Sequence, residues 1–340
     1  MRLWEGRRIG GLVRYNVGPE EEGLPQVPPE VLRCVGFLSP REDASPDGTV
    51  FFVKVNDPAT SSEVSGVYAV TAKHMLQDYA VEESSDKAWL RLNKRAGGVA
   101  RIYTQIKDWI QHPDADVAIH PWPREHCFDI ESFPVRQHLI DDIKVEWKVG
   151  PGDEVFLSGL FWHHSGETKN APIVRVGNIA AMRGDKIYTT NYGPMDAYLI
   201  EVRSLGGLSG SPVFFNGGGL RTMSIPAVSI GGRPLPSRTE KRVLAEGFFL
   251  LGLVHGHYRE RAQRIDIEEG FINSGVAIVV PADKIQELIV DPKEVDIRRK
   301  RNEEENRKKA STASDRAKPE LTDEEFQKTL ERASHRVAPD

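Results

Sequence analysis

The sequence has few of the features that mark secreted or membrane-spanning proteins. Only two cysteines, Cys34 and Cys127, occur among 340 residues, so one disulfide at most could form, and we do not favour it. Scarce cysteine is typical of a reducing compartment. No apolar run reaches the roughly 18 residues of a membrane-crossing helix, and the first residues lack the apolar core of a signal peptide. We therefore expect a cytoplasmic protein without a membrane partner.

A strong net charge and the spacing of metal ligands are also absent. The formal net charge of −5 is small for this length, so nucleic acid is not an expected partner. Imidazoles cluster at His163–His164 and at His255 and His257, but no cysteine or carboxylate spacing completes a zinc site. We predict neither a metal ion nor another cofactor.

A glycine-rich turn at Gly207–Val213 carries the strongest chemical signal. Its sequence, Gly-Leu-Ser-Gly-Ser-Pro-Val, has one glycine two residues before Ser209 and another directly after it. Glycine lets the backbone curl until neighbouring N–H groups point at one spot, where an oxyanion can be stabilised. Because a serine hydroxyl is a weak nucleophile by itself, this turn predicts a base and a group that orients the base elsewhere in the chain.

Two segments upstream of the turn supply these partners. An apolar run, Val67–Thr71, leads to His74, and Asp116 precedes the short apolar run Val117–Ile119. A single histidine or serine in such a place is usually structural. The three residues together, in the order His, Asp, Ser, form a candidate catalytic set.

The chain resembles the trypsin-like (chymotrypsin-fold) serine peptidases over roughly residues 31–290. The matching blocks are Thr71–His74, Asp116–Ile119, Gly207–Val213, Gly152–Gly159 and Gly275–Pro281. The last two blocks look like those of the bacterial HtrA-type enzymes, although we expect no PDZ domain here. A serine at the position of Ser211, two residues after the nucleophile, also has precedent in the glutamyl endopeptidases. The resemblance implies that Ser209 attacks a peptide carbonyl, His74 moves the proton and Asp116 orients the imidazole. The N–H groups of Gly207 and Ser209 would form the oxyanion hole.

The predicted fold is all-β: two six-stranded antiparallel Greek-key barrels and a C-terminal helix, followed by a charged helical or disordered tail. Short β-rich runs separated by Gly, Pro, Asp and Ser clusters favour this class. The predicted divisions are an N-terminal arm (1–30), a first barrel (31–135), a linker (136–150), a second barrel with its closing helix (151–290) and a charged tail (291–340).

In the family that the chain resembles, the residue six positions before the nucleophile lies at the base of the specificity pocket. We use that residue to predict substrate preference. Here that residue is Arg203, with Ser204 beside it and His255 on the strand expected to wall the pocket. A cation there would favour an acidic residue before the cleaved bond. The alternative, which we favour, is that Arg203 points to solvent, because an unpaired buried cation is costly.

Two further segments are candidate sites for a regulatory partner. About half of residues 291–340 are charged. This tail is either a solvated helix with a loose end or a segment to which a partner protein binds. The insertion at 216–246 is either a partner surface, expected at the barrel end away from the site, or a loop without a role.

The function predicted from these observations is a bacterial serine endopeptidase acting on protein or peptide substrates. Leu208 replaces the aspartate that pairs with a freed N-terminus in the animal enzymes. Activation by that route is therefore not expected, and the enzyme could stay latent until a partner or ligand orders its loops. Two alternatives remain open: a catalytically silent binding or scaffold protein, and an acyl hydrolase that cleaves esters.

Overall fold

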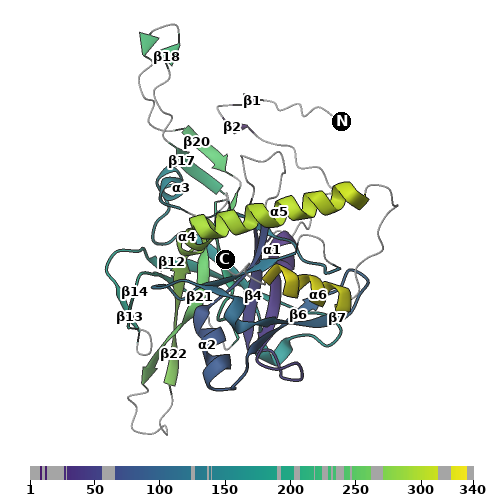
Figure 1. The fold of residues 1–340 in the computed structure, drawn as a ribbon. Coiled ribbons are helices and arrows are strands. Elements are labelled where there is room, and N and C mark those ends of the chain that lie inside the picture. The colour runs from purple at the N-terminus through teal and green to yellow at the C-terminus, as the bar shows by residue number, and fades with distance from the viewer. Residues whose placement is uncertain are drawn as a thin grey trace.

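Strands dominate the molecule and form two β-rich units, and helices lie before, within, between and after them in the chain (Figure 1). The computed structural model describes residues 8–9, 12–13, 27, 29–55, 66–123, 127–135, 138, 140–189, 193–202, 207–217, 219–223, 229–230, 233–234, 241–245, 247–261, 271–312 and 323–334.

The first unit is one sheet with the strand order β7-β6-β3-β4-β5-β9-β8. Neighbours along this path are antiparallel, whereas β10 pairs in parallel with β4. The strands are β3 (Val35–Ser39), β4 (Gly48–Val55), β5 (Gly66–Thr71), β6 (Lys87–Asn93), β7 (Val99–Gln105), β8 (Ile110–Gln111), β9 (Ala118–Trp122) and β10 (Phe133–Pro134). The central strands read as continuous apolar runs because both of their faces are buried.

The second unit is a closed barrel with the order β11-β12-β15-β22-β21-β16, and every pair in it is antiparallel. Its strands are β11 (Glu154–Gly159), β12 (Ile173–Ala181), β15 (Tyr198–Glu201), β16 (Pro212–Asn216), β21 (Phe248–Arg261) and β22 (Phe271–Pro281). Closure leaves no unpaired strand edge in this ring. The predicted all-β fold class, with a barrel followed by a helix, is confirmed.

Several elements differ in detail from the prediction. Not every strand of the second half belongs to the barrel: β13 (Ile187–Thr189) pairs with β14 (Gly193–Met195) outside the closed ring. In the first unit β7, β8 and β10 were not predicted, nor was the helix that begins next to His74. The described helices are α1 (Pro29–Arg33), α2 (Lys73–Val81), η2 (Ile106–Asp108), α3 (Asp141–Glu146), η4 (Trp162–His164), α4 (Ala282–Ile289), α5 (Pro292–Thr312) and α6 (Asp323–Ser334). None of them is both long and apolar enough to cross a membrane.

One hydrophobic core joins the two units. It contains the buried side chains of the first sheet together with residues such as Phe156, Phe214 and Ile278 from the wall of the second barrel. A second, smaller cluster fills the interior of the barrel. Because apolar contacts continue across the boundary, the two units are held against each other where the loops of the site meet.

The charged tail packs against the first unit as two helices (Figure 1). In α6 the side chains of Phe326 and Leu330 are buried, and Phe326 packs against Trp122 and Phe128 with ring centroids 5.1 and 4.7 Å apart. The apolar face of α6 is therefore covered by the chain itself.

The 216–246 insertion forms two small antiparallel pairs in its described residues. One joins β17 (Gly219–Met223) and β20 (Lys241–Ala245), and the other joins β18 (Ser229–Ile230) and β19 (Arg233–Pro234). Figure 1 shows these strands projecting from the end of the molecule opposite α2. A further pair near the N-terminus joins β1 (Arg8–Ile9) and β2 (Leu12–Val13).

Candidate active site

Four residues from both units meet at the boundary between them. His74 lies in the first turn of α2, directly after β5, and Asp116 lies two residues before β9. His255 belongs to β21 of the barrel, and Ser209 lies in the turn that precedes β16. Antiparallel pairing of β5 with β9 brings His74 and Asp116 together, although 42 residues separate them in the chain.

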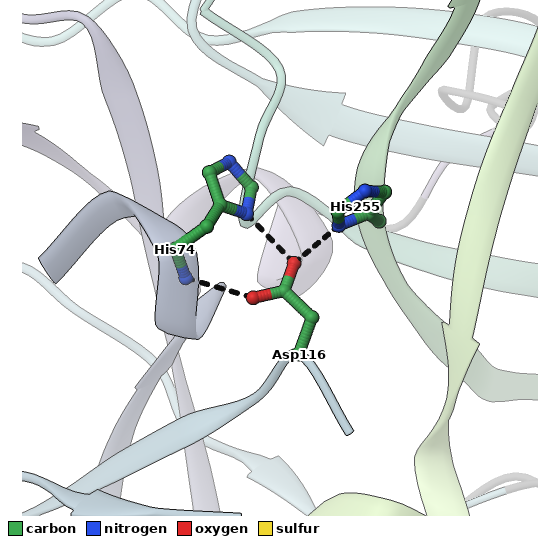
Figure 2. Close-up of side chains that lie close together, drawn as sticks. All are labelled: His74, Asp116 and His255. Carbon is green, nitrogen blue, oxygen red and sulfur yellow. Dashed lines mark hydrogen bonds and ion pairs between the residues drawn. The ribbon is translucent and has the colours of Figure 1, made fainter. Parts of the chain in front are cut away.

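Asp116 is the centre of this group (Figure 2). Its Oδ1 accepts a hydrogen bond from the backbone N–H of His74 at 2.8 Å. Its Oδ2 lies 2.7 Å from Nδ1 of His74 and 2.5 Å from Nδ1 of His255. An ionised carboxylate only accepts hydrogen bonds, so both rings carry a proton on Nδ1. In a neutral ring, Nε2 is then the atom that accepts a proton.

Burial and hydrogen bonding act in opposite directions on these groups. Burial by itself raises the pKa of Asp116, but the hydrogen bonds from His255 and His74 outweigh it and hold that pKa well below its ordinary value. Burial likewise lowers the pKa of His74, but the hydrogen bond and charge of Asp116 outweigh it and leave that pKa above its ordinary value. The pair is thus arranged as an ionised carboxylate that supports a basic imidazole.

The same three side chains are the group of potential metal ligands in the described residues: one ligand atom from each lies within 4.8 Å of the others. A tetrahedral zinc ion holds its ligands at about 2.0–2.2 Å, which separates the ligand atoms by about 3.3–3.6 Å. The two contacts to Asp116 Oδ2, at 2.7 and 2.5 Å, are shorter than this spacing. The geometry is that of a carboxylate accepting two N–H groups, and a metal would have to push the side chains apart.

Ser209 belongs to the same network through His255. Its Oγ donates a hydrogen bond to the backbone carbonyl oxygen of His255 at 3.2 Å, while the His255 side chain reaches Asp116. The turn also abuts the strand that leads to His74. A Cβ added to Gly210 would lie only 2.5 Å from Thr71 Oγ1 and 3.3 Å from the backbone nitrogen of Ala72. Ser209 itself is partly exposed, so a substrate can reach it.

The backbone of the turn has the conformation that its glycines predict. Gly207 and Gly210 have φ values of +93° and +82°, a region that residues with a Cβ rarely adopt. No described residue accepts a hydrogen bond from the backbone N–H of Gly207 or of Ser209. Both donors are therefore available to an incoming oxygen.

A second layer of contacts supports the loop that carries Asp116. The Lys73 ammonium donates to the carbonyl of His112 at 2.9 Å. His112 Nδ1 accepts from the backbone N–H groups of Asp114 and Ala115, which leaves its Nε2 to donate to Glu287 in α4 at 2.9 Å. The closing helix of the barrel thus holds the Asp116 loop of the other unit.

The structure brings the side chains of His74, Asp116 and His255 into contact, and Ser209 Oγ is bonded to the backbone carbonyl of His255. The catalytic roles of His74, Asp116 and Ser209 stay a prediction. His255 contacts Asp116, a contact that the sequence did not suggest. Whether His255 also touches substrate stays a prediction. Arg203 and Ser204 lie outside the described residues.

A separate open hollow of about 810 Å³ lies beside α3 and shares no residue with this network. Two of the cations that line it are paired: Arg183 contacts Asp196 and Asp283, and Lys144 contacts Asp141.

The chain is similar to several solved structures. The protease domain of MamO from Magnetospirillum magneticum is 16% identical, covers 77% of this chain and 98% of its own, and gives a TM-score of 0.42. The structure of Deg5 is 14% identical over 77% of this chain and 91% of its own, with a TM-score of 0.40. The HtrA-type protease AlgW, solved with a decapeptide, is 13% identical over 77% of this chain and 66% of its own, with a TM-score of 0.39.

These structures include HtrA-type proteases, the kind that the sequence blocks resemble. No family model and no curated protein sequence matches the chain. TM-scores below 0.5 carry no argument about the function of this chain.

Proposed function

We propose that the protein is a serine endopeptidase that hydrolyses peptide bonds in protein or peptide substrates. The observation that carries the proposal is the double contact of Asp116 with His74, through Nδ1 and the backbone N–H, beside a serine turn with two unpaired N–H groups. Such a contact fixes the ring orientation and leaves Nε2 as the proton acceptor.

In the proposed reaction Ser209 Oγ forms a bond to the substrate carbonyl carbon while its proton passes to His74 Nε2. The N–H groups of Gly207 and Ser209 stabilise the oxyanion, each typically contributing about 3–4 kcal/mol to lowering the barrier. When the C–N bond breaks, the leaving amine takes the proton from His74. Water then hydrolyses the acyl ester on Ser209 with the same imidazole as base.

The hydrogen bond of Ser209 supports the idea of a resting state. Its hydroxyl proton is directed at the carbonyl of His255 rather than at the imidazole of His74. Rotation about the Cα–Cβ bond of Ser209 has to occur before the proton can pass to His74, and catalytic hydrogen bonds often tighten only when substrate binds. We propose that substrate or a partner protein induces this rotation. The same contact is the observation that favours the alternative, a silent binding or scaffold protein.

A fluorophosphonate probe tests for an activated serine. We expect the wild type and Ser132→Ala, a control outside the turn, to be labelled equally, and Ser209→Ala to lose the label. If no label enters the wild type, with or without added peptides, the silent alternative is favoured.

A panel of peptide and ester substrates then separates the peptidase from the acyl hydrolase. Cleavage of peptides supports the proposal, and turnover of esters alone contradicts it. Within the peptide panel, cleavage after Asp or Glu would support a pocket role for Arg203, and cleavage after Lys or Arg would exclude it.

A further inference from the structure

One residue of the first sheet, Thr49 in β4, holds the turn that carries Ser209. Thr49 is fully buried, and its backbone N–H donates to the carbonyl oxygen of Ser209 at 2.9 Å. Its hydroxyl lies 3.0 Å from the carbonyl oxygen of Gly207. These two carbonyls belong to the peptide groups directly before and after the one that contains the Ser209 N–H. The direction of that N–H is therefore constrained from both sides by a single residue.

The hydroxyl of Thr49 has every hydrogen bond that it can make. A threonine hydroxyl offers one donor and two acceptor sites. The carbonyl of Gly207 takes the proton, and the backbone N–H of Leu160 and the hydroxyl of Ser211 donate to the two acceptor sites, each at 3.1 Å. Leu160 and Ser211 are fully buried, so neither can turn to solvent for another partner.

The surrounding backbone fits too closely to replace these contacts. A Cβ on Gly210 would lie 2.2 Å from the carbonyl oxygen of Thr49, and a Cβ on Gly159 would lie 1.9 Å from Ser211 Oγ. The same Thr49 carbonyl accepts a hydrogen bond from Thr71 Oγ1 at 2.8 Å, three residues before His74. Thr49 thus connects the serine turn to the strand that delivers His74.

We propose that Thr49 is a positioning residue whose hydroxyl fixes the oxyanion-binding conformation of residues 207–211. The inference rests on the proposed function for its effect on catalysis, but its effect on the turn stands on the contacts alone. Thr49 acts through Gly207 and Ser209 and does not touch substrate. Misplacement of a catalytic group by about 1 Å can cost about 100-fold in rate.

The test compares Thr49→Val, which keeps the shape and the backbone N–H but removes the hydroxyl, with Thr49→Ser, which keeps the hydroxyl. The matched control is Thr104→Val, because Thr104 is also a buried threonine whose hydroxyl makes two hydrogen bonds, to Ala88 O and from Trp109 Nε1. We expect Thr49→Val to lower kcat about 10- to 100-fold with KM nearly unchanged, since only transition-state stabilisation is lost. Thr49→Ser should recover most of kcat, and Thr104→Val should retain it even if its Tm falls equally.

Hydrogen exchange over residues 207–213 provides a readout that does not need activity. Faster exchange in Thr49→Val, reversed in Thr49→Ser, supports the proposal. Exchange and kcat like those of the wild type in Thr49→Val overturn it. If the wild type has no activity at all, the proposed function fails, and exchange by itself then decides whether Thr49 holds the turn.

Discussion

At the scale of single residues, Asp116 determines what the site can do. Burying a carboxylate is costly unless hydrogen bonds replace its water. Three N–H groups do so here, two from His74 and one from the His255 ring. The carboxylate therefore stays ionised and holds two imidazoles that come from different units of the molecule.

Asp116→Asn should lower kcat by about 10⁴-fold. In either orientation the amide is neutral, so the His74 ring would lose the negative charge that stabilises its cation. An amide N–H that faces Nδ1 would also remove the tautomer that leaves Nε2 basic. Steady-state kinetics on a peptide substrate measure the change, with the exposed Asp86→Asn as control. A loss below 10-fold would show that Asp116 does not orient the base.

Activity should rise with pH and have its midpoint above the ordinary histidine value of about 6.5, because the pKa of His74 is raised and only neutral His74 accepts the serine proton. The interaction of protonated His74 with Asp116 also stabilises the folded protein. This stabilisation is complete at pH values below the pKa of His74 in the unfolded chain, and it is lost as the pH rises through the higher pKa of His74 in the folded protein. An NMR titration of His74 in Ser209→Ala measures the value directly. The midpoint should fall in Ser209→Ala/Asp116→Asn, and an unchanged midpoint would contradict the assignment.

His255→Gln should lower kcat about 10-fold without abolishing labelling of Ser209. The variant removes the second imidazole from Asp116 but keeps the backbone carbonyl that accepts the Ser209 hydroxyl proton. A buried hydrogen bond to a charged group typically contributes about 1.5–3 kcal/mol, so its loss should also reduce stability. The control is His164→Gln, because His164 is exposed. An increased KM at constant kcat would favour the predicted substrate-binding role instead.

At the scale of elements, the two helices of the charged tail have different contacts with the body. In α5 only part of one face is buried: Tyr68 of β5 donates to Glu294, and Arg298 donates to the Tyr68 hydroxyl. In α6 the contact is aromatic, since Phe326 packs against Trp122 and Phe128. A segment that is too charged to form its own core can thus be ordered by the apolar surface of another unit.

Phe326→Ala should detach α6 from the first sheet. Truncation of a buried phenylalanine typically costs about 3–5 kcal/mol, which exceeds what a 12-residue helix can recover by itself. Limited proteolysis should therefore cleave near α6 faster than in the wild type, while the exposed Lys328→Ala should behave normally. Equal protection in Phe326→Ala would mean that the aromatic contact does not hold the helix.

At the scale of the whole molecule, the two β-rich units should unfold together. They share one hydrophobic core, and Arg91 of β6 donates to the carbonyls of Ser165, Gly166 and Glu167 in the second unit. Asn170 binds the same guanidinium at 2.6 Å. Breaking this contact should weaken the boundary on which the site depends.

Arg91→Met should lower the free energy of unfolding by about 3 kcal/mol or more, because several carbonyls lose a charged donor. Thermal unfolding should show one transition in the wild type and a broader or divided one in the variant. The control is Arg41→Met, because Arg41 forms an exposed ion pair with Glu83, and such pairs contribute little. Identical, separate transitions in all three proteins would mean that the units are not coupled.

Local pattern was enough to predict much of this molecule. The apolar runs that became β5 and β9, the glycine turn around Ser209 and the order of His74 and Asp116 are visible in the chain because short-range sterics and strand periodicity fix them. The strand β7 was missed although its buried residues alternate, since its polar outward residues interrupt the apolar signal. The helix α2 was missed because only one short face of it is apolar.

The amino-acid sequence by itself therefore determined the all-β class and the residue types of the site. Only the tertiary structure decided that His255 contacts Asp116, that Thr49 holds the serine turn and that α6 covers an aromatic surface of the first sheet. Each of these contacts joins residues far apart in the chain, and their partners are selected by packing across the boundary of two units. No local spacing encodes such a choice, because it depends on which surfaces are still uncovered when the two units close on each other.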